Sequence, residues 1–168
     1  MKDTIICDLD GTLANCEHRV HHVQSAKQGG KPKNWDAFYA GVKDDEANYP
    51  VLNLLRTYID WAFGYQAGYA TTSDWFDYHL IFCSGRPERC RADTDWWLQE
   101  VCEFDHTEYT LYMRKDGDHR QDYIVKQEIL DEHIDKERVL FVLDDRQQVV
   151  DMWRRNGLTC FQVAEGNF

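Results

Sequence analysis

Short apolar runs alternate with stretches of helical periodicity along most of the chain. Apolar runs that predict buried strands occupy residues 4–8, 79–83, 109–113, 139–143 and 159–163. Between them, residues 87–104, 121–133 and 146–156 have the spacing of helices, and Gly157 follows the last as a stop signal. Because strands and helices alternate and the strands are apolar on both faces, we predict an α/β fold with a doubly wound parallel sheet.

One long segment, residues 15–78, interrupts this alternation. It contains a glycine- and lysine-rich loop at residues 26–35, predicted helices at residues 35–42 and 50–63, and a polar, aromatic-containing stretch at residues 64–77. Ligand sites in doubly wound sheets lie beyond the carboxyl ends of the strands. We therefore expect a single domain over residues 1–168, in which residues 15–78 form a largely helical, cap-like insertion after the first strand.

The net charge limits the kinds of partner. The 168 residues include 30 acidic and 19 basic side chains, which gives a formal charge of −11. Binding to a long stretch of nucleic acid requires clustered Lys and Arg, so we do not expect it here. The charge does not exclude a small basic pocket that holds one phosphate or a strand end. Because no apolar run has the roughly 20 residues of a membrane span and no signal peptide is recognised, we expect a cytoplasmic protein without a membrane partner.

Paired carboxylates follow two of the predicted strands. Asp8 and Asp10 come at the end of the first strand, just before Gly11, which we expect to turn the chain. Asp144 and Asp145 follow the strand at residues 139–143. Four carboxylates at neighbouring strand ends repel one another unless a cation lies among them. Their oxygen atoms favour a hard divalent ion, Mg²⁺ above all.

These carboxylates belong to a longer series of motifs. Asp8-Leu9-Asp10-Gly11-Thr12, Ser84, Lys126 and Asp144-Asp145 have the order and separation of the four motifs of one superfamily. The chain resembles the haloacid dehalogenase-like (HAD) phosphotransferases. The resemblance implies a Rossmann-like sheet and a phosphatase in which Asp8 attacks phosphorus and forms an aspartyl-phosphate. Asp10 would protonate the leaving oxygen and later activate water.

The same resemblance assigns the ligands of the metal and of the phosphate. Mg²⁺ would be held by Asp8, the main-chain carbonyl of Asp10, and Asp144. Asp145 would bind the ion directly or through its water molecules, and the sequence leaves both open. The phosphoryl oxygens would be held by Ser84, Lys126 and Thr12 with its neighbouring amides.

A closer resemblance lies outside the four motifs. Residues 111–126 and 141–168 are similar to the 3′-phosphatase domain of phage polynucleotide kinase-phosphatases. It implies removal of 3′-phosphates from nucleic-acid ends, with Arg19 and Arg86 near the phosphate. Asp122, four residues before Lys126, could orient the lysine on one helix face. Arg114 is either a further phosphate contact or a plain surface charge.

Four points remain open from the sequence. The substrate could instead be a free (deoxy)nucleotide carrying a 3′- or 5′-phosphate. A catalytically silent binding subunit is a further alternative, although it would be expected to have lost Asp8, Asp10 or Lys126. The chain contains no GxxxxGK[ST] motif, so we expect a stand-alone phosphatase whose kinase or ligase partner, if any, is a separate protein. A homo-oligomer is also possible.

An aromatic stripe in the insertion has two interpretations. Trp35, Phe38 and Tyr39 lie at helical spacing near Lys31 and Lys33. They could form a wall for stacking bases with basic flanks. Spacing of i, i+3 and i+4 equally describes the buried face of an amphipathic helix, and the sequence favours this second interpretation.

Overall fold

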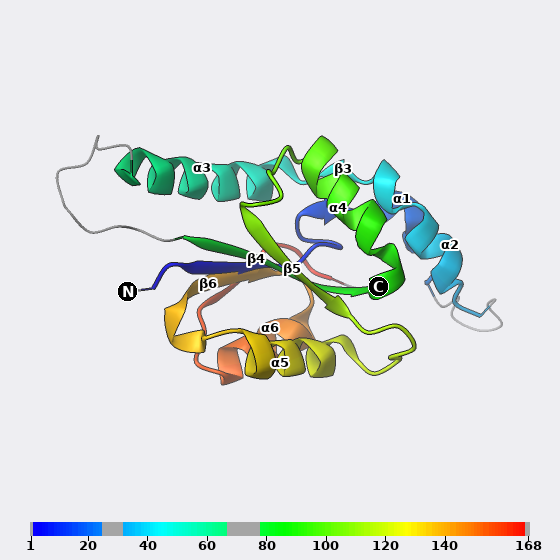
Figure 1. Ribbon diagram of the computed structural model, residues 1–168. Helices are drawn as coiled ribbons and strands as arrows, with labels where there is room; N and C mark the ends of the chain where they lie inside the picture. Colours follow the sequence, from blue (N-terminus) through cyan, green and yellow to red (C-terminus); the bar gives the residue numbers. More distant parts are fainter. Residues whose placement is uncertain (1, 25–31, 67–77, 167–168) are drawn as a thin grey trace.

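The computed structural model describes residues 2–24, 32–66 and 78–166, with side chains described up to residue 60 in the second range (Figure 1). Five parallel strands form the central sheet in the order β5-β4-β1-β6-β7. Their bounds are β1 (Thr4–Cys7), β4 (His79–Pro87), β5 (Tyr109–Arg114), β6 (Val139–Asp144) and β7 (Cys160–Gln162). The predicted α/β fold with a parallel sheet is confirmed.

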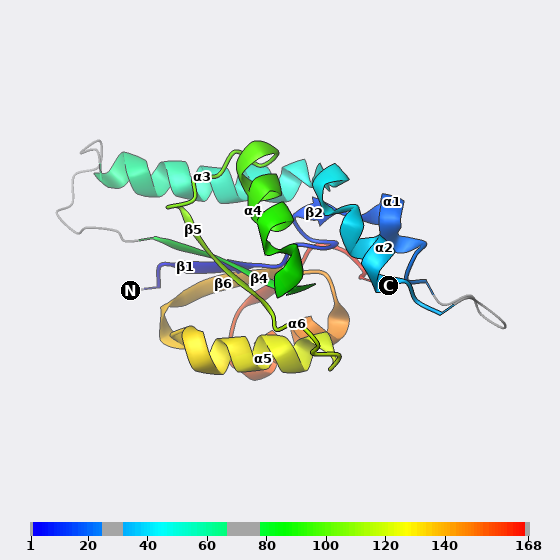
Figure 2. The same ribbon diagram turned by 45° about the vertical axis from the view of Figure 1, so that its right-hand side comes forward.

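Helices cover both faces of this sheet (Figures 1 and 2). One face carries α3 (Tyr49–Gln66) and α4 (Arg91–Glu100), and the other carries α5 (Asp122–His133) and α6 (Gln147–Arg155). Alternate residues of β1 point to opposite faces of the sheet. Ile5 and Cys7 belong to the core under α3 and α4, whereas Ile6 packs with α5 and α6. The central strands are therefore apolar on both sides.

The helix predicted at residues 87–104 is shorter than expected. Strand β4 continues through Pro87, and a 3-10 turn, η2 (Glu88–Cys90), precedes α4. At the other end, the amide of Cys102 donates to the carbonyl of Trp97, and Glu103 adopts a φ of 54°, so the helix ends before Phe104. The stop predicted for the last helix is confirmed, because Gly157 follows α6 with a φ of 80°.

The segment between β1 and β4 divides into two parts. Two short helices, α1 (Glu17–Val20) and α2 (Trp35–Ala40), lie near the carboxyl ends of the strands (Figures 1 and 2), whereas α3 packs against the sheet and contributes to its core. A 3-10 turn, η1 (Val42–Asp44), and an antiparallel pair of two-residue strands, β2 (Ala14–Asn15) and β3 (Glu46–Ala47), were not predicted. Most of the glycine- and lysine-rich loop and of the polar stretch after α3 lies outside the described residues.

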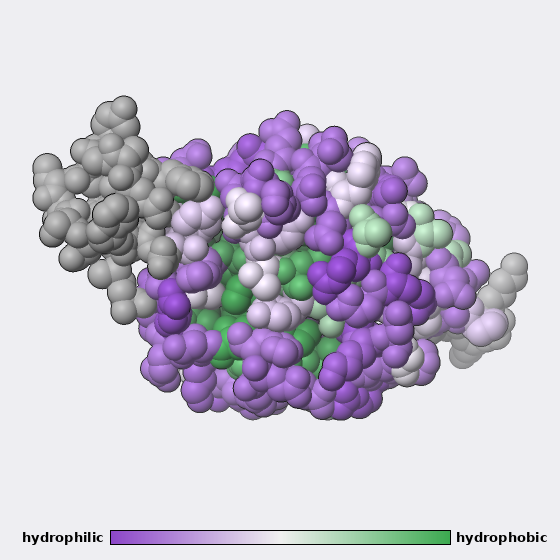
Figure 3. All heavy atoms as spheres, in the orientation of Figure 1, coloured by the Kyte–Doolittle hydropathy of each residue, from purple (hydrophilic) through white to green (hydrophobic). Residues whose placement is uncertain are grey.

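The face drawn in Figure 3 is mainly hydrophilic. In Figure 3, hydrophobic residues gather in the middle of one face, along β5, which is an edge strand of the sheet. Among the described residues, none of the helices is both long and apolar enough to span a membrane.

Candidate active site

The first strand carries Asp8 to the carboxyl edge of the sheet. The amide of Asp8 donates to the carbonyl of Leu143 at 2.9 Å, which continues the pairing of β1 with β6 by one residue. Gly11 then turns the chain with a φ of 85°, a conformation that favours glycine. The turn closes with a 2.8 Å bond from the amide of Ala14 to the carbonyl of Leu9. Asp10 therefore lies in the turn and not in the strand.

Three carboxylates form a buried acidic group. One ligand oxygen each from Asp8, Asp144 and Asp145 lies within 4.8 Å of the others, and all three residues are buried. Burial and the neighbouring Asp144 charge raise the pKa of Asp145 to about 6, and burial also raises the pKa of Asp8. Three carboxylates this close together carry negative charges that repel one another. Such a group of oxygen ligands fits a hard divalent cation. The side chain of Asp10 is not part of this group.

Lys126 of α5 faces the acidic group. Its Nζ lies 2.8 Å from Oδ1 of Asp8, 2.9 Å from Oδ2 of Asp144 and 3.6 Å from Oδ2 of Asp122. Burial alone would lower the pKa of Lys126, but the charges of Asp144 and Asp8 raise it well above its usual range. The lysine is therefore a fixed positive charge beside Asp8.

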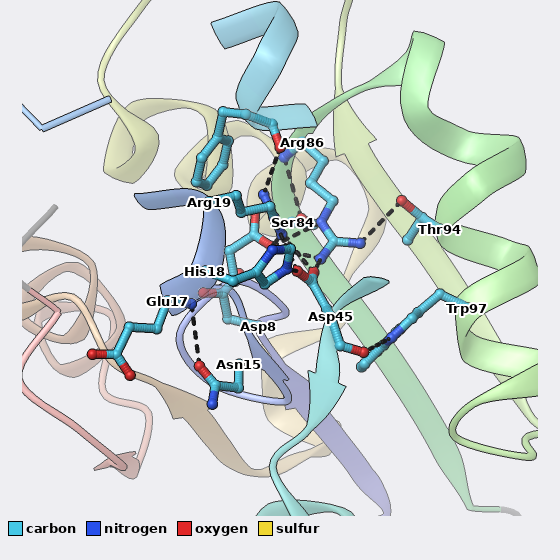
Figure 4. Close-up of polar contacts among 12 residues, drawn as sticks. Asp8, Asn15, Glu17, His18, Arg19, Asp45, Ser84, Arg86, Thr94 and Trp97 are labelled. Carbon is cyan, nitrogen blue, oxygen red and sulfur yellow. Dashed lines mark hydrogen bonds and ion pairs between the residues drawn. The ribbon is translucent and has the colours of Figure 1, made fainter. Parts of the chain in front are cut away.

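A buried network of arginines and carboxylates lies at the same edge of the sheet (Figure 4). Arg19 of α1 and Arg86 of β4 both donate to Oδ1 of Asp10, each at 2.5 Å from Nη2. Burial alone would raise the pKa of Asp10, but Arg86 and Arg19 hold it well below its usual range. The two arginines predicted near the phosphate thus converge on the predicted acid, from elements far apart in the sequence.

Asp45 completes this network, and sequence reasoning missed it. Its carboxylate accepts from Arg19 at 2.6 Å, from Arg86 Nη2 at 2.9 Å, and contacts Nε2 of His18 at 3.0 Å. The indole of Trp97 donates to its main-chain carbonyl at 2.7 Å. No local motif marks Asp45. The available signal was indirect: two arginines in one pocket need more carboxylate charge than Asp10 supplies.

The remaining predicted residues lie around these two groups. Thr12 is buried, and its hydroxyl donates to Oδ1 of Asp145 at 3.5 Å. The hydroxyl of Ser84 is also buried and accepts from the amide of Arg86 at 3.2 Å. Each side chain is therefore oriented by a residue of one of the two groups.

Arg114 is placed differently from a plain surface charge. Its guanidinium donates to the carbonyls of Gly85 and Arg120 and, at 3.1 Å, to Oδ1 of Asp122. Asp122 in turn lies beside Lys126. Arg114 is thus connected to Asp8 indirectly, through Asp122 and Lys126.

Comparison with known proteins identifies the family of this chain. The sequence profile of the family described as "Polynucleotide kinase PNKP phosphatase domain" matches residues 2–168. The chain belongs to this family. It is therefore a phosphatase domain of the HAD type, and the resemblance inferred from the motifs is confirmed. A HAD domain of the effector protein Lem4 from Legionella pneumophila, 15% identical with a TM-score of 0.52 over 99% of the chain and 88% of its own, shares the fold.

Several relatives are considerably longer than this phosphatase domain. A protein of Autographa californica nuclear polyhedrosis virus named "Putative bifunctional polynucleotide kinase/RNA ligase" is 29% identical over 151 residues, which are 89% of this chain and 17% of the viral protein. Chains from two structures of the Pnkp1/Rnl/Hen1 complex, one described as an RNA repair complex, are 34% and 35% identical, each with a TM-score of 0.66. Each match covers 99% of this chain, but 44% and 48% of those chains.

Proposed function

We propose that this phosphatase domain removes the terminal phosphate from nucleic-acid ends, most directly a 3′-phosphate, in a Mg²⁺-dependent reaction. The observation that carries the proposal is the position of Asp8, which is buried among Lys126 and the carboxylates of Asp144 and Asp145. The family supports a polynucleotide substrate, and the similarity to a chain of an RNA repair complex supports RNA ends in particular.

Asp8 is the proposed nucleophile. Its carboxylate oxygen attacks phosphorus, the ester bond to the 3′-oxygen breaks, and an aspartyl-phosphate forms. Lys126, 2.8 Å from Asp8, supplies positive charge where the phosphoryl group gains negative charge. Ser84 lies at the adjacent strand end and donates its hydroxyl to a phosphoryl oxygen. Water then cleaves the phosphoaspartate and releases inorganic phosphate.

Asp10 is the proposed acid and base. It gives a proton to the leaving 3′-oxygen and takes one from the attacking water in the second step. Without substrate, Arg19 and Arg86 donate to Asp10 and suppress its protonation. A bound phosphate dianion would compete for the same guanidinium groups, since arginine forks match phosphate as well as carboxylate. Substrate binding would thereby weaken the interactions that keep Asp10 ionised.

The acidic group is the proposed metal site. Asp8, Asp144 and Asp145 would hold Mg²⁺, with Thr12 orienting Asp145. The bound ion would screen the negative charge of the nucleophile and of the phosphate from each other. Asp122, which itself pairs with Arg114, is proposed to hold Lys126 in place.

One substrate panel tests this function. Phosphate release is measured from 3′- and 5′-phosphorylated oligonucleotides and from 3′- and 5′-mononucleotides, each with Mg²⁺ and with EDTA. We expect the 3′-phosphorylated oligonucleotide to be hydrolysed fastest, and only with Mg²⁺. If the mononucleotides alone are hydrolysed, the enzyme is a nucleotide phosphatase. If none of the four releases phosphate, the proposal is refuted.

A further inference from the structure

A cavity lies beside the proposed reaction centre. It has a volume of about 400 Å³, which is in the range of small-ligand sites. Asp122 and Arg114 form part of its wall, and through Asp122 it borders Lys126. Trp35 and Tyr39 of α2 form another part of the wall. A group joined to the phosphate at Asp8 would therefore have space on the side of α2.

The charge of this cavity is opposite to that of the protein. Two carboxylates line it, those of Asp118 and Asp122, against five cationic side chains: Lys33, Arg89, Arg114, Arg120 and Arg146. The chain as a whole carries a charge of −11. Two of these cations also pair with carboxylates outside the wall, Arg89 with Asp36 and Arg120 with Glu128, which neutralise part of the excess. The wall itself still presents more cationic than anionic groups, which favours an anionic ligand such as a nucleotide over a neutral one.

The aromatic stripe of α2 is divided between the core and the cavity. Phe38 is 1% exposed and packs with Val20 and Val23, as the core interpretation requires. Trp35, by contrast, is 37% exposed and lines the cavity. Its ring stacks on that of Tyr39, with centroids 5.8 Å apart and an angle of 22° between the planes. The core interpretation of the stripe is therefore confirmed for Phe38, whereas Trp35 is open to the cavity.

Cations border both rings. Nζ of Lys33 lies 5.3 Å from the centre of the Trp35 ring, and Cζ of Arg89 lies 5.7 Å from the centre of the Tyr39 ring. Both rings of the aromatic pair therefore lie in the cavity wall, each beside a cation. Stacked rings with cationic neighbours are typical of sites for single-stranded nucleic acid.

We propose that Trp35 and Tyr39 form a stacking platform for the base of the terminal nucleotide, whose 3′-phosphate is bound at Asp8. This inference rests on the proposed function. It favours a single-stranded end, because either face of an unpaired last base is free to lie against the platform. Because any base has an apolar face, the platform recognises the presence of a base and has little preference for its identity.

The test compares two 3′-phosphorylated oligoribonucleotides of the same sequence. One ends in a normal nucleotide, and the other ends in a tetrahydrofuran residue, a stable analogue that lacks the base. We expect wild-type kcat/KM to be about 5- to 150-fold higher for the end with a base. Trp35→Ala should bring this ratio close to one, and Trp35→Phe should retain most of it. Trp96→Ala is the matched control, because Trp96 is 43% exposed and lies on α4 outside the cavity wall.

The outcomes separate the two proposals. If wild-type protein hydrolyses both ends equally well, the platform is refuted and the phosphatase function stands. If Trp35→Ala lowers kcat/KM equally for both ends, Trp35 has a structural role and the platform is again refuted. If neither oligonucleotide releases phosphate, the proposed function itself fails. Thermal unfolding of each variant confirms that the comparison is made on folded protein.

Discussion

Asp45 accepts two hydrogen bonds from the guanidinium of Arg19, from Nε to Oδ1 and from Nη2 to Oδ2, each 2.6 Å long. This paired geometry fixes both the position and the plane of the guanidinium. The same carboxylate accepts from Arg86, and all three side chains are buried. Asp45 is therefore placed to orient the two arginines that we propose to bind the phosphate.

Replacing Asp45 by Asn should weaken phosphate binding. The amide removes the negative charge between two buried arginines, which costs about 3 kcal/mol of unfolding free energy when one partner of a buried ion pair is lost. We expect KM for a 3′-phosphorylated oligonucleotide to rise by about tenfold, equivalent to about 1.4 kcal/mol, with a smaller change in kcat. Competitive inhibition by inorganic phosphate should weaken by a similar factor.

Asp44→Asn provides the control for that experiment. Asp44 is adjacent in sequence but exposed, so its substitution should change neither stability nor KM appreciably. If Asp45→Asn lowers the unfolding free energy but leaves KM and phosphate inhibition unchanged in folded protein, Asp45 is structural and does not position the arginines.

Much of the fold was predictable because the signal is local. Continuous apolar runs at 4–8, 79–83 and 139–143 predict buried parallel strands, and the carboxylates that follow them meet at one edge of the sheet. Strands β2 and β3 have two residues each, too few for a periodic pattern. The prediction ends β4 too early, because proline is common in the first turn of a helix and Pro87 therefore indicates a helix start. In the structure Pro87 belongs to the strand.

The arrangement of the site depends on contacts between distant parts of the chain. Motif spacing alone groups Asp8, Lys126 and Asp144, and both carboxylates lie within hydrogen-bonding distance of the lysine. The role of Asp45 in the site comes from its hydrogen bonds to Arg19 and Arg86, which are 26 and 41 residues away along the chain. No local sequence pattern indicates such contacts. Likewise, the sequence does not indicate that Phe38 is buried while Trp35 is exposed, because this depends on how α2 packs against the rest of the protein.

Asp8→Asn should abolish turnover and leave the fold intact. The amide is a poor nucleophile, so we expect kcat to fall by at least about 10³-fold. Lys126 keeps its contact with Asp144, and unfolding free energy should change by less than about 1 kcal/mol. Rapid acid quenching followed by mass spectrometry should find phosphate on a peptide containing residue 8 in wild-type protein and not in the variant.

The control for this substitution lies at the opposite end of the same strand. Asp3→Asn alters a residue that pairs with Arg138, away from the carboxyl edge of the sheet, and should leave kcat unchanged. Substantial turnover by Asp8→Asn would rule out Asp8 as the nucleophile.

Magnesium should stabilise the protein through the acidic group. At an ion concentration about 100 times Kd, binding to the folded state alone raises the unfolding free energy by about 2.7 kcal/mol. Asp145→Asn should reduce this gain, because it removes one of three charged ligands. Asp151→Asn, an exposed position on α6, should not. Thermal unfolding with and without Mg²⁺ measures both effects, and equal stabilisation of the Asp145 variant would exclude this residue from the metal site.

Gly85→Ala should impair catalysis through Asp122. A β-carbon at residue 85 would lie 3.0 Å from Cγ of Asp122 and overlap its carboxylate, which contacts both Arg114 and Lys126. We expect kcat/KM to fall by about tenfold, with about 1–3 kcal/mol of destabilisation from overpacking. In an Asp122→Ala background the overlap disappears, so Gly85→Ala should add little further loss. Steady-state kinetics of both single variants and the double variant measure this coupling. Fully additive losses would show that Gly85 acts independently of Asp122.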